Sequence, residues 1–138
     1  MVTFYKNERL KHLLPAEVRL WTKFIGIHGA YFDRFEFDVH VGEGMEVDPA
    51  WPANIVAAVY ALTAKRIDVV GYRGEEVWLF EIKPDAGITA ANQVNAYEAL
   101  YVRQFGKPVT LYKAIVTERI NRDERWLCKE SGIRIYVV

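Results

Sequence analysis

The sequence predicts a single α/β domain, residues 1–138, in which helices flank a mixed central β-sheet and a further helix and strand follow at the C-terminal end. Two observations lead to this fold class. Apolar and aromatic runs on either side of a glycine turn are typical of an antiparallel hairpin. A long helical pattern followed by another apolar run is typical of a helical crossover into a parallel strand. A chain of 138 residues is long enough for one such domain and its core.

Composition limits the classes of protein to consider. The chain is 51% hydrophobic and 14% aromatic, which indicates a globular protein and not a disordered one. No run approaches the roughly 18 apolar residues of a membrane helix, and the start lacks a signal-peptide pattern, so we expect no membrane partner. The single cysteine, Cys128, excludes an internal disulfide and fits a reducing compartment, so we expect a cytoplasmic protein with Cys128 buried.

The net charge of the chain limits the class of protein less strongly than its composition does. The formal net charge is zero, whereas dedicated nucleic-acid binders are often strongly basic because phosphate contacts supply much of their affinity. Any surface that binds nucleic acid must therefore be local, or the contact must be brief or assisted by a partner.

The first helix is predicted from Pro15 to about Ile27, because proline suits the first turn of a helix and apolar residues recur there with helical spacing. Residues 1–14 are expected to form a short ordered arm. The apolar stripe of the helix consists of Val18, Trp21 and Ile25, with Leu20 and Phe24 beside it.

A half-buried strand is predicted from Tyr31 to Val41, because apolar and polar residues alternate along it. The apolar face is predicted to hold Phe35, Phe37, Val39 and Val41. The polar face is predicted to hold Arg34, Glu36, Asp38 and His40. We expect the carboxylates of this polar face to be solvated, and the three histidines of the chain show no metal-ligand spacing.

The segment from Gly42 to Ala64 is predicted to be an acidic loop followed by a short helix. Residues 42–52 contain two glycines and two prolines, which are turn formers. Residues 53–64 are rich in alanine and valine, and their apolar spacing fits a helix, although a strand is not excluded. Packing of this helix on the sheet is the default expectation. The alternatives are a place beside the substrate cleft or a contact with a second copy or a partner protein.

The next segment predicts a hairpin of two strands, Ile67–Val70 and Val77–Ile82. Gly74 and Glu75 fit a two-residue type II′ turn, which requires glycine at its first central position. The turn fixes the register and pairs Arg73 with Glu76, Tyr72 with Val77, and Val70 with Leu79. Continued two residues further, the same register places Asp68 opposite Glu81.

The rest of the chain is predicted to alternate helices and strands. Thr89 is expected to cap a helix that continues to about Phe105, before Gly106 and Pro108. A strand from Val109 to Val116 should lie parallel to its neighbour. A polar helix, Asn121–Ser131, is expected to turn Trp126 and Leu127 inward, and Ile133–Val138 forms a last strand, which we expect at the edge of the sheet.

The opposed carboxylates are the strongest functional signal. Directly opposed side chains on antiparallel strands lie about 4.5–5.5 Å apart at Cβ, where like charges are destabilising. A divalent cation between Asp68 and Glu81 would remove this repulsion, and Mg²⁺ prefers such oxygen ligands. Lys83 shares the face of Glu81 and can contact a phosphate or an attacking water. The alternative is that Asp68 marks a strand end and that Glu81 and Lys83 are solvent-facing.

These residues resemble a known family. Ile67-Asp68 followed by Glu81-Ile82-Lys83 resembles the signature of the PD-(D/E)XK nuclease superfamily in its E-x-K form, with isoleucine in place of the proline. Downstream, Gln93 and Tyr97 resemble the Q-x-x-x-Y motif of its RecB-like and Cas4-like exonuclease branch. The resemblance covers residues 65–101 well and the remainder in outline.

The resemblance implies a restriction-endonuclease-like αβββαβ core and a set of site residues. It implies that Asp68, Glu81 and the main-chain carbonyl of Ile82 hold Mg²⁺ or Mn²⁺, with Lys83 acting on the water or the developing charge. Glu17, in the first turn of the first helix, either completes the metal shell or complements the helix dipole.

It further implies that Gln93 and Tyr97 contact the DNA backbone or order the acids. The alternative for this pair is a helix with a core-packed Tyr97 and a solvated Gln93.

The predicted function is therefore a Mg²⁺- or Mn²⁺-dependent deoxyribonuclease that acts on DNA, with the Q-x-x-x-Y resemblance favouring exonuclease or single-strand-end processing. The alternative is a catalytically inactive nuclease-fold module that binds or assembles within a larger DNA-processing complex. Zero net charge favours the alternative. The presence of Asp68, Glu81 and Lys83 together favours the enzyme, because a module without metal has no need to retain the repulsion between two acids.

Overall fold

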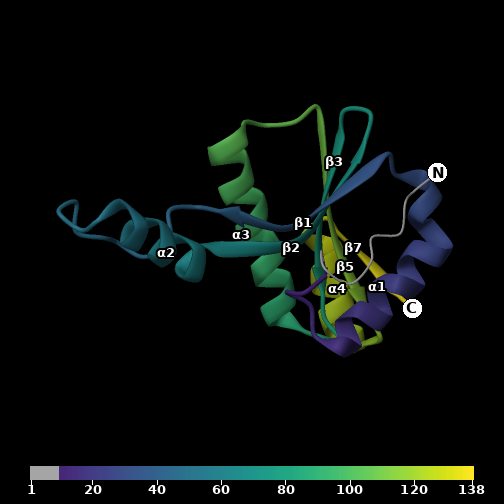
Figure 1. Ribbon diagram of the computed structural model, residues 1–138. Coiled ribbons are helices and arrows are strands. Elements are labelled where there is room, and N and C mark those ends of the chain that lie inside the picture. Colours follow the sequence, from purple (N-terminus) through teal and green to yellow (C-terminus); the bar gives the residue numbers. More distant parts are fainter. Residues whose placement is uncertain (1–9) are drawn as a thin grey trace.

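The computed structural model describes residues 10–138, so most of the predicted N-terminal arm lies outside the described residues. The fold is a five-stranded sheet with helices on both faces (Figure 1). The strands of this sheet are β1 (Arg34–Val41), β2 (Lys65–Arg73), β3 (Glu76–Ile82), β5 (Thr110–Thr117) and β7 (Ile133–Val137). The helices are α1 (Pro15–His28), α2 (Ala53–Thr63), α3 (Ile88–Phe105) and α4 (Arg122–Glu130), with a short 3₁₀ turn at Gly29–Tyr31.

The sheet is mixed, as predicted. Its strand order is β1-β2-β3-β5-β7; β1, β2 and β3 are antiparallel neighbours, whereas β3, β5 and β7 are parallel. Helix α3 connects β3 to β5 and helix α4 connects β5 to β7, which is the crossover connection that parallel neighbours need. The last strand, β7, lies at the edge, which was also predicted. The α/β fold class is therefore confirmed.

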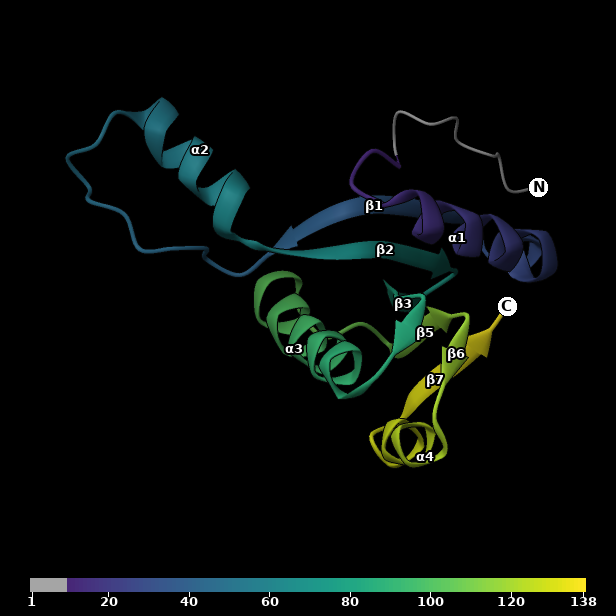
Figure 2. The same cartoon turned by 90° about the horizontal axis from the view of Figure 1, so that it is seen from below.

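Two apolar cores lie on opposite faces of the sheet. Figure 2 shows the helices over these faces, α1 on one side and α3 and α4 on the other. The core under α1 is aromatic, and the ring of Trp21 lies 5.2 Å from those of both Phe35 and Phe80, edge to face. The core on the other face packs α3 and α4 against the sheet. Its buried side chains include Val70, Leu79, Val94, Tyr97, Ile115 and Cys128. Cys128 is buried, as predicted.

The β2–β3 hairpin has the predicted register. Arg73 pairs with Glu76, and Val70 pairs with Leu79. Gly74 has a φ of +54°, as the first central position of a type II′ turn requires. Glycine adopts this left-handed conformation at no steric cost, so the turn chemistry alone sets which side chains of the two strands meet.

The predicted face of the first strand is wrong in its second half. Phe35 and Phe37 pack in the core under α1, but Val39 and Val41 pack in the core against α3. The reason is Asp38, which has a φ of +56° and breaks the alternation of side chains along β1. Its carboxylate pairs with Arg66 on β2.

Helix α4 also differs from the prediction. Trp126 and Leu127 are 59% and 42% exposed, and the inward-facing residue is Cys128. The Asn121 side chain accepts a hydrogen bond from the Glu124 amide and starts the helix at Arg122, and Cys128 is the residue of α4 that packs in the core against the sheet.

Two boundaries differ more slightly. Helix α3 begins at Ile88, after Gly87 and not after Thr89. The predicted loop after β3 contains a two-residue strand, β4 (Asp85–Ala86), which pairs in parallel with β6 (Arg119–Ile120).

The segment from Gly42 to Ala64 contains the predicted loop and helix, but the expectation that the helix packs on the sheet is wrong. Helix α2 extends away from the sheet (Figures 1 and 2), and none of its residues is buried. Within the part of the chain that the structure describes, no helix is long and apolar enough to span a membrane.

Candidate active site

The two predicted acids lie where the β2–β3 pairing ends. The last paired residues are Val69 and Phe80, and Asp68 and Glu81 follow immediately. The Ile82 amide donates a hydrogen bond of 2.9 Å to Asp68 Oδ2, so a side chain there takes the place of a main-chain partner. We call the space bounded by Asp68, Glu81 and Ile82 the acid notch.

The acid notch raises the pKa of both carboxyl groups. Burial raises the pKa of Glu81 to about 8, and repulsion by Asp68 adds to it, against the opposing effects of the Tyr97 hydroxyl and Lys83. Burial also raises the pKa of Asp68 to about 6, opposed by the hydrogen bond from Ile82. Each acid therefore influences the pKa of the other, so the two carboxyl groups lie within electrostatic reach of each other.

One carboxylate oxygen in the acid notch has no partner among the residues that the structure describes. Glu81 is 6% exposed, and its Oε2 accepts no hydrogen bond from residues 10–138. Leaving a buried polar atom unpaired costs about 1–3 kcal/mol, and more for a charged group. A ligand that supplies positive charge would remove this cost.

The donors available in the acid notch suit a hard cation. Among residues 10–138, no group of three or more histidine, cysteine, aspartate and glutamate side chains is arranged to hold a metal. Two carboxylates are nevertheless the usual protein share of a Mg²⁺ site, which keeps several waters and substrate phosphates as ligands. The N–H and C=O of one strand residue point to the same side, so the Ile82 carbonyl faces the Asp68 side, as its amide does.

Lys83 lies beside the acid notch and is exposed. Its charge lowers the pKa of Glu81, which places its ammonium group within electrostatic reach of that carboxylate. None of the described acidic residues forms an ion pair with it within 4.0 Å. The Lys83 amide donates to the Val116 carbonyl at 3.0 Å, which holds the start of its side chain against β5.

Glu17 has features of both sequence interpretations. Its Oε1 accepts a hydrogen bond of 3.1 Å from the Leu14 amide, so it caps the start of α1. Its charge also contributes to raising the pKa of Asp68, so α1 brings it towards the acid notch.

Helix α3 brings Tyr97 to the acid notch, whereas Gln93 is exposed one turn earlier. Tyr97 is buried, and burial together with the nearby Glu81 carboxyl raises the pKa of its hydroxyl. Gln93 forms no hydrogen bond with any residue that the structure describes. The two residues thus lie on the same side of the helix but in different environments.

His12 contacts the strand that bears Asp68, which was not predicted from the sequence. Its Nε2 lies 2.9 Å from the main-chain oxygen of Asp68 and holds the strand that bears this acid. The two residues are 56 positions apart, so no local spacing could have revealed the contact.

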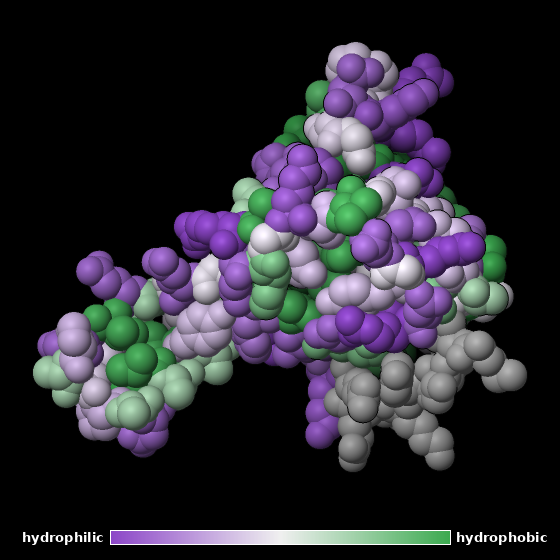
Figure 3. All heavy atoms as spheres, turned by 90° about the horizontal axis from the view of Figure 1, so that it is seen from above, coloured by the Kyte–Doolittle hydropathy of each residue, from purple (hydrophilic) through white to green (hydrophobic). Residues whose placement is uncertain are grey.

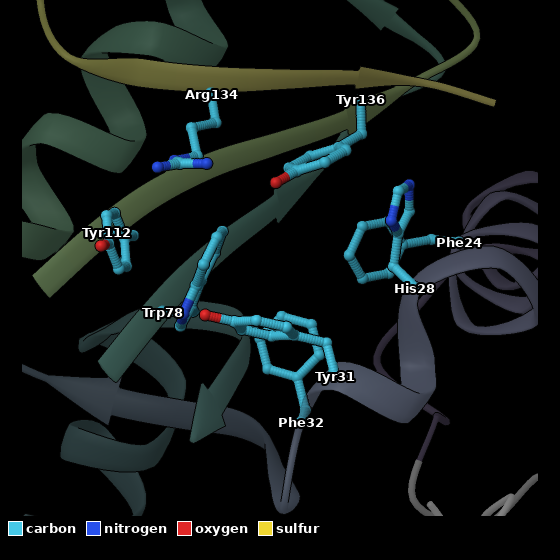
Figure 4. A pocket seen from close by; sticks show the side chains of 8 residues that line it. All are labelled: Phe24, His28, Tyr31, Phe32, Trp78, Tyr112, Arg134 and Tyr136. Carbon is cyan, nitrogen blue, oxygen red and sulfur yellow. The ribbon is translucent and has the colours of Figure 1, made fainter. Parts of the chain in front are cut away.

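An aromatic cavity of about 200 Å³ lies on the α1 side of the sheet, near the beginning of β3 (Figure 4). It faces away from the acid notch, because Trp78 points into the core under α1 and Glu81 points towards α3. Arg134 covers the rings of Trp78 and Tyr112. The lining residues are Phe24, His28, Tyr31, Phe32, Trp78, Tyr112, Arg134 and Tyr136.

Comparison with known proteins identifies relatives of the fold. No protein-family model matches the chain, and no curated protein matches it significantly. Among solved structures, a repair endonuclease from Pyrococcus abyssi matches 99% of the chain with a TM-score of 0.54 and 12% identity. The chain shares the nuclease-like fold of that protein. It spans 49% of the other chain's length.

Two further structures agree with this likeness. A complex of EndoMS with double-stranded DNA matches 99% of this chain and 48% of that chain, with a TM-score of 0.53 and 12% identity. A protein of unknown function matches 86% of this chain and 56% of that chain, with a TM-score of 0.55 and 15% identity. At these identities the likeness shows the fold alone.

Proposed function

We propose that the protein is a Mg²⁺- or Mn²⁺-dependent nuclease that hydrolyses phosphodiester bonds in DNA. The observation that supports it best is the acid notch, where the buried Glu81 and the half-buried Asp68 both have raised pKa values and Glu81 Oε2 lacks a partner among residues 10–138. A fold evolved only for stability gains nothing from this arrangement, since burying like charges together is costly.

Asp68, Glu81 and the Ile82 carbonyl would hold the cation. The chemistry supplied there would be a lowered pKa of a bound water and neutralised charge on the scissile phosphate. Asp68 is fixed for this task by the hydrogen bond from Ile82 and by the contact of His12 with its main chain. Glu17, whose charge contributes to raising the pKa of Asp68, would add an outer carboxylate.

Lys83 would act on the phosphate. It is exposed beside the acid notch, has no acidic partner among the described residues, and presents a compact point charge. Such a charge stabilises the negative charge that develops during attack, or orients the attacking water. Tyr97 would hold the Glu81 side chain, and the exposed Gln93 would contact the DNA backbone.

DNA is proposed as the substrate because of the structural neighbours. One of them is described as a repair endonuclease and another was determined in complex with double-stranded DNA. Cleavage from an end, or processing of single-strand ends, is the finer proposal, and it depends on the resemblance of Gln93 and Tyr97 to the Q-x-x-x-Y motif.

The test combines cleavage with metal binding. Labelled single- and double-stranded DNA, with free and blocked ends, is incubated with Mg²⁺ or Mn²⁺, and Mn²⁺ binding is measured by calorimetry without DNA. Asp68→Asn should lose both cleavage and Mn²⁺ binding, whereas Glu75→Gln, an exposed acid in the hairpin turn, should lose neither. Cleavage that persists unchanged in Asp68→Asn would refute the assignment.

The alternative, an inactive nuclease-fold module, predicts a different result in the same experiment. Such a protein would bind DNA without cleaving it and would show no Mn²⁺ binding to the acid notch. The Glu81 oxygen without a partner among residues 10–138 disfavours this alternative. Without a cation, this buried oxygen destabilises the fold and no interaction compensates for it.

A further inference from the structure

The arm of residues 42–64 and the aromatic cavity both lie away from the acid notch. In the arm, Ile55 and Leu62 are exposed, and Figure 3 shows apolar surface gathered there. The cavity, of about 200 Å³, lies on the α1 side of the sheet (Figure 4). It is enclosed by rings and holds one guanidinium group, that of Arg134, so its chemistry limits the kind of ligand that it can bind.

The cavity lies between two pairs of aromatic rings (Figure 4). On one side are Trp78 of β3 and Tyr112 of β5, whose ring centroids lie 4.5 Å apart. On the other side are His28 of α1 and Tyr136 of β7, whose ring centroids lie 5.0 Å apart. Among residues 10–138, no ring of the first pair contacts a ring of the second. We call the space between these two pairs the ring slot.

Buried rings close the inner end of the ring slot. The centroid of Phe24 lies 5.2 Å from that of Tyr136 and 6.2 Å from that of Phe32. The centroid of Phe32 lies 5.3 Å from that of Trp78, so the two phenylalanines connect the two walls. Both phenylalanines are buried. The ring slot therefore has aromatic walls and an aromatic floor, which suit a flat and largely apolar ligand.

Hydrogen bonds hold two of the lining rings in place. The Tyr31 hydroxyl lies 2.8 and 3.0 Å from the carboxylate oxygens of Glu76 and donates to them, and the Trp78 indole donates to Glu76 Oε1 at 3.2 Å. The guanidinium of Arg73 lies 3.9 Å from the centroid of the Tyr31 ring. A site whose side chains are fixed before binding loses less freedom when the ligand binds. These contacts therefore favour the ring slot as a binding site.

Arg134 supplies the positive charge of the ring slot. Its guanidinium lies 4.6 Å from the centroid of Tyr112 and 5.2 Å from that of Trp78. The residue is exposed, and no acidic residue that the structure describes pairs with it within 4.0 Å. An aromatic cavity without this arginine would suit a cation. The guanidinium at its opening favours an anionic ligand instead.

Size and charge together indicate a nucleobase with an adjoining phosphate. Cavities that hold drug-sized ligands measure about 300–1,000 Å³, so the smaller ring slot fits a single ring system. Every nucleobase has flat faces that stack on aromatic side chains. Arginine recognises phosphate through the planar array of its N–H donors.

We propose that the ring slot binds one nucleobase between its two ring pairs and that Arg134 binds the phosphate of the same nucleotide. A free nucleotide and a nucleotide of a single strand whose base has left the stack share this chemistry. The ring slot faces away from the acid notch, so the bound nucleotide is distinct from the one at which cleavage is proposed. The inference thus goes beyond the proposed nuclease function and uses none of its residues.

Calorimetry in EDTA measures nucleotide binding without metal-dependent cleavage. Deoxyadenosine monophosphate should bind to the wild-type chain, whereas deoxyadenosine and inorganic phosphate should each bind about ten-fold more weakly or less. A short single-stranded oligonucleotide distinguishes the two sources, because tighter binding than that of the mononucleotide indicates a strand. The proposal is overturned if neither nucleotide ligand binds at about 1 mM, or if tetramethylammonium binds in preference to both.

Substitutions in the ring slot test the charge and the rings separately. Arg134→Gln removes the charge and should weaken nucleotide binding by about ten-fold or more. Arg125→Gln, at an exposed arginine of α4 without an ion pair among the described residues, is the matched control and should not.

Tyr136→Leu removes one ring and should also weaken nucleotide binding by about ten-fold, whereas Tyr136→Phe retains the ring and should bind like the wild type. Thermal unfolding shows whether each variant is folded. The exposed Arg134 decides the outcome where the half-buried Tyr136 does not tolerate leucine. Binding of either nucleotide ligand that Arg134→Gln leaves unchanged would overturn the proposal.

Asp68→Asn separates the ring slot from the nuclease assignment. This variant should lose metal-dependent cleavage but should bind the nucleotide in EDTA as tightly as the wild type, because Asp68 does not line the ring slot. Failure of the nuclease assignment therefore leaves the binding result unaffected. Loss of nucleotide binding in Asp68→Asn would assign the nucleotide to the acid notch and overturn the proposal.

Discussion

The acid notch and the arm of residues 42–64, which extends away from the sheet, both hold side chains in an energetically unfavourable environment. In the acid notch, two carboxyl groups lie out of water without enough partners, and Glu81 Oε2 has none among residues 10–138. In the arm, apolar side chains are exposed without a cover. A buried carboxyl group without a partner favours a bound cation, whereas an uncovered apolar helix favours another protein surface. The kind of mismatch therefore indicates the kind of partner.

The largest effect is expected in the acid notch. Glu81→Gln keeps the shape of the side chain but removes its charge, so DNA cleavage should fall by about a thousand-fold if the residue holds a catalytic cation. Single-turnover cleavage assays in Mg²⁺ measure the rate. An exposed acid outside the notch, changed in Glu75→Gln, serves as the control. A loss of less than ten-fold in the cleavage rate would show that Glu81 does not hold a catalytic cation.

The next effect concerns stability and compares the packed sheet with the arm. Leu79→Ala, in the core, should lower the free energy of unfolding by about 2–5 kcal/mol because it leaves a cavity. Leu62→Ala, in the arm, should change it by less than about 0.5 kcal/mol at a protein concentration where the chain is monomeric. Urea unfolding followed by circular dichroism gives both values. Similar losses at the two positions would show that the arm is packed against its own chain.

A smaller effect should appear as a pH dependence of the metal-free protein. The folded-state pKa of Glu81 is raised to about 8 from an ordinary value of about 4.3, so the folded state holds a proton that the unfolded state loses. Stability is therefore highest at low pH within this window and falls as pH rises from about 4 to about 8. Glu81→Gln should flatten most of this slope. Thermal unfolding in EDTA between pH 5 and 8.5 measures it, and a stability that rises with pH would contradict the raised pKa.

The smallest expected effect is that of Tyr97→Phe. Its hydroxyl lowers the pKa of Glu81, so its removal should raise that pKa further and move the ascending limb of the pH–rate profile, where Glu81 loses its proton, to higher pH. The maximal rate should fall by only a few-fold. Tyr101→Phe, one turn further along α3 and also buried, is the control and should leave the profile in place. An unchanged profile in Tyr97→Phe would mean that Tyr97 only packs.

Much of the sheet and the acid pair could be predicted because local chemistry determines them. The turn at Gly74 fixes the hairpin register, and the register brings Asp68 and Glu81 together. The long helices follow from periodicity and from their stop signals. The strand order and the edge position of β7 follow from the crossover rule once the elements are known.

The features that were not predicted from the sequence also have physical causes. The left-handed conformation of Asp38 is stabilised by an ion pair with Arg66, 28 positions away, so the change of face in β1 could not be predicted from alternation. Periodicity showed that α2 is an apolar helix but could not show what covers it. The contact of His12 with Asp68 spans 56 positions and leaves no pattern in the sequence.

Strand β2 connects the segment of residues 42–64 to the acid notch. This strand begins at Lys65, at the root of the arm, and reaches Asp68 through Arg66 and Ile67, with no glycine or proline between them. Such a segment is an extended strand without a flexible hinge residue. A contact that fixes the strand at Lys65 would therefore also restrict the position of the Asp68 carboxylate.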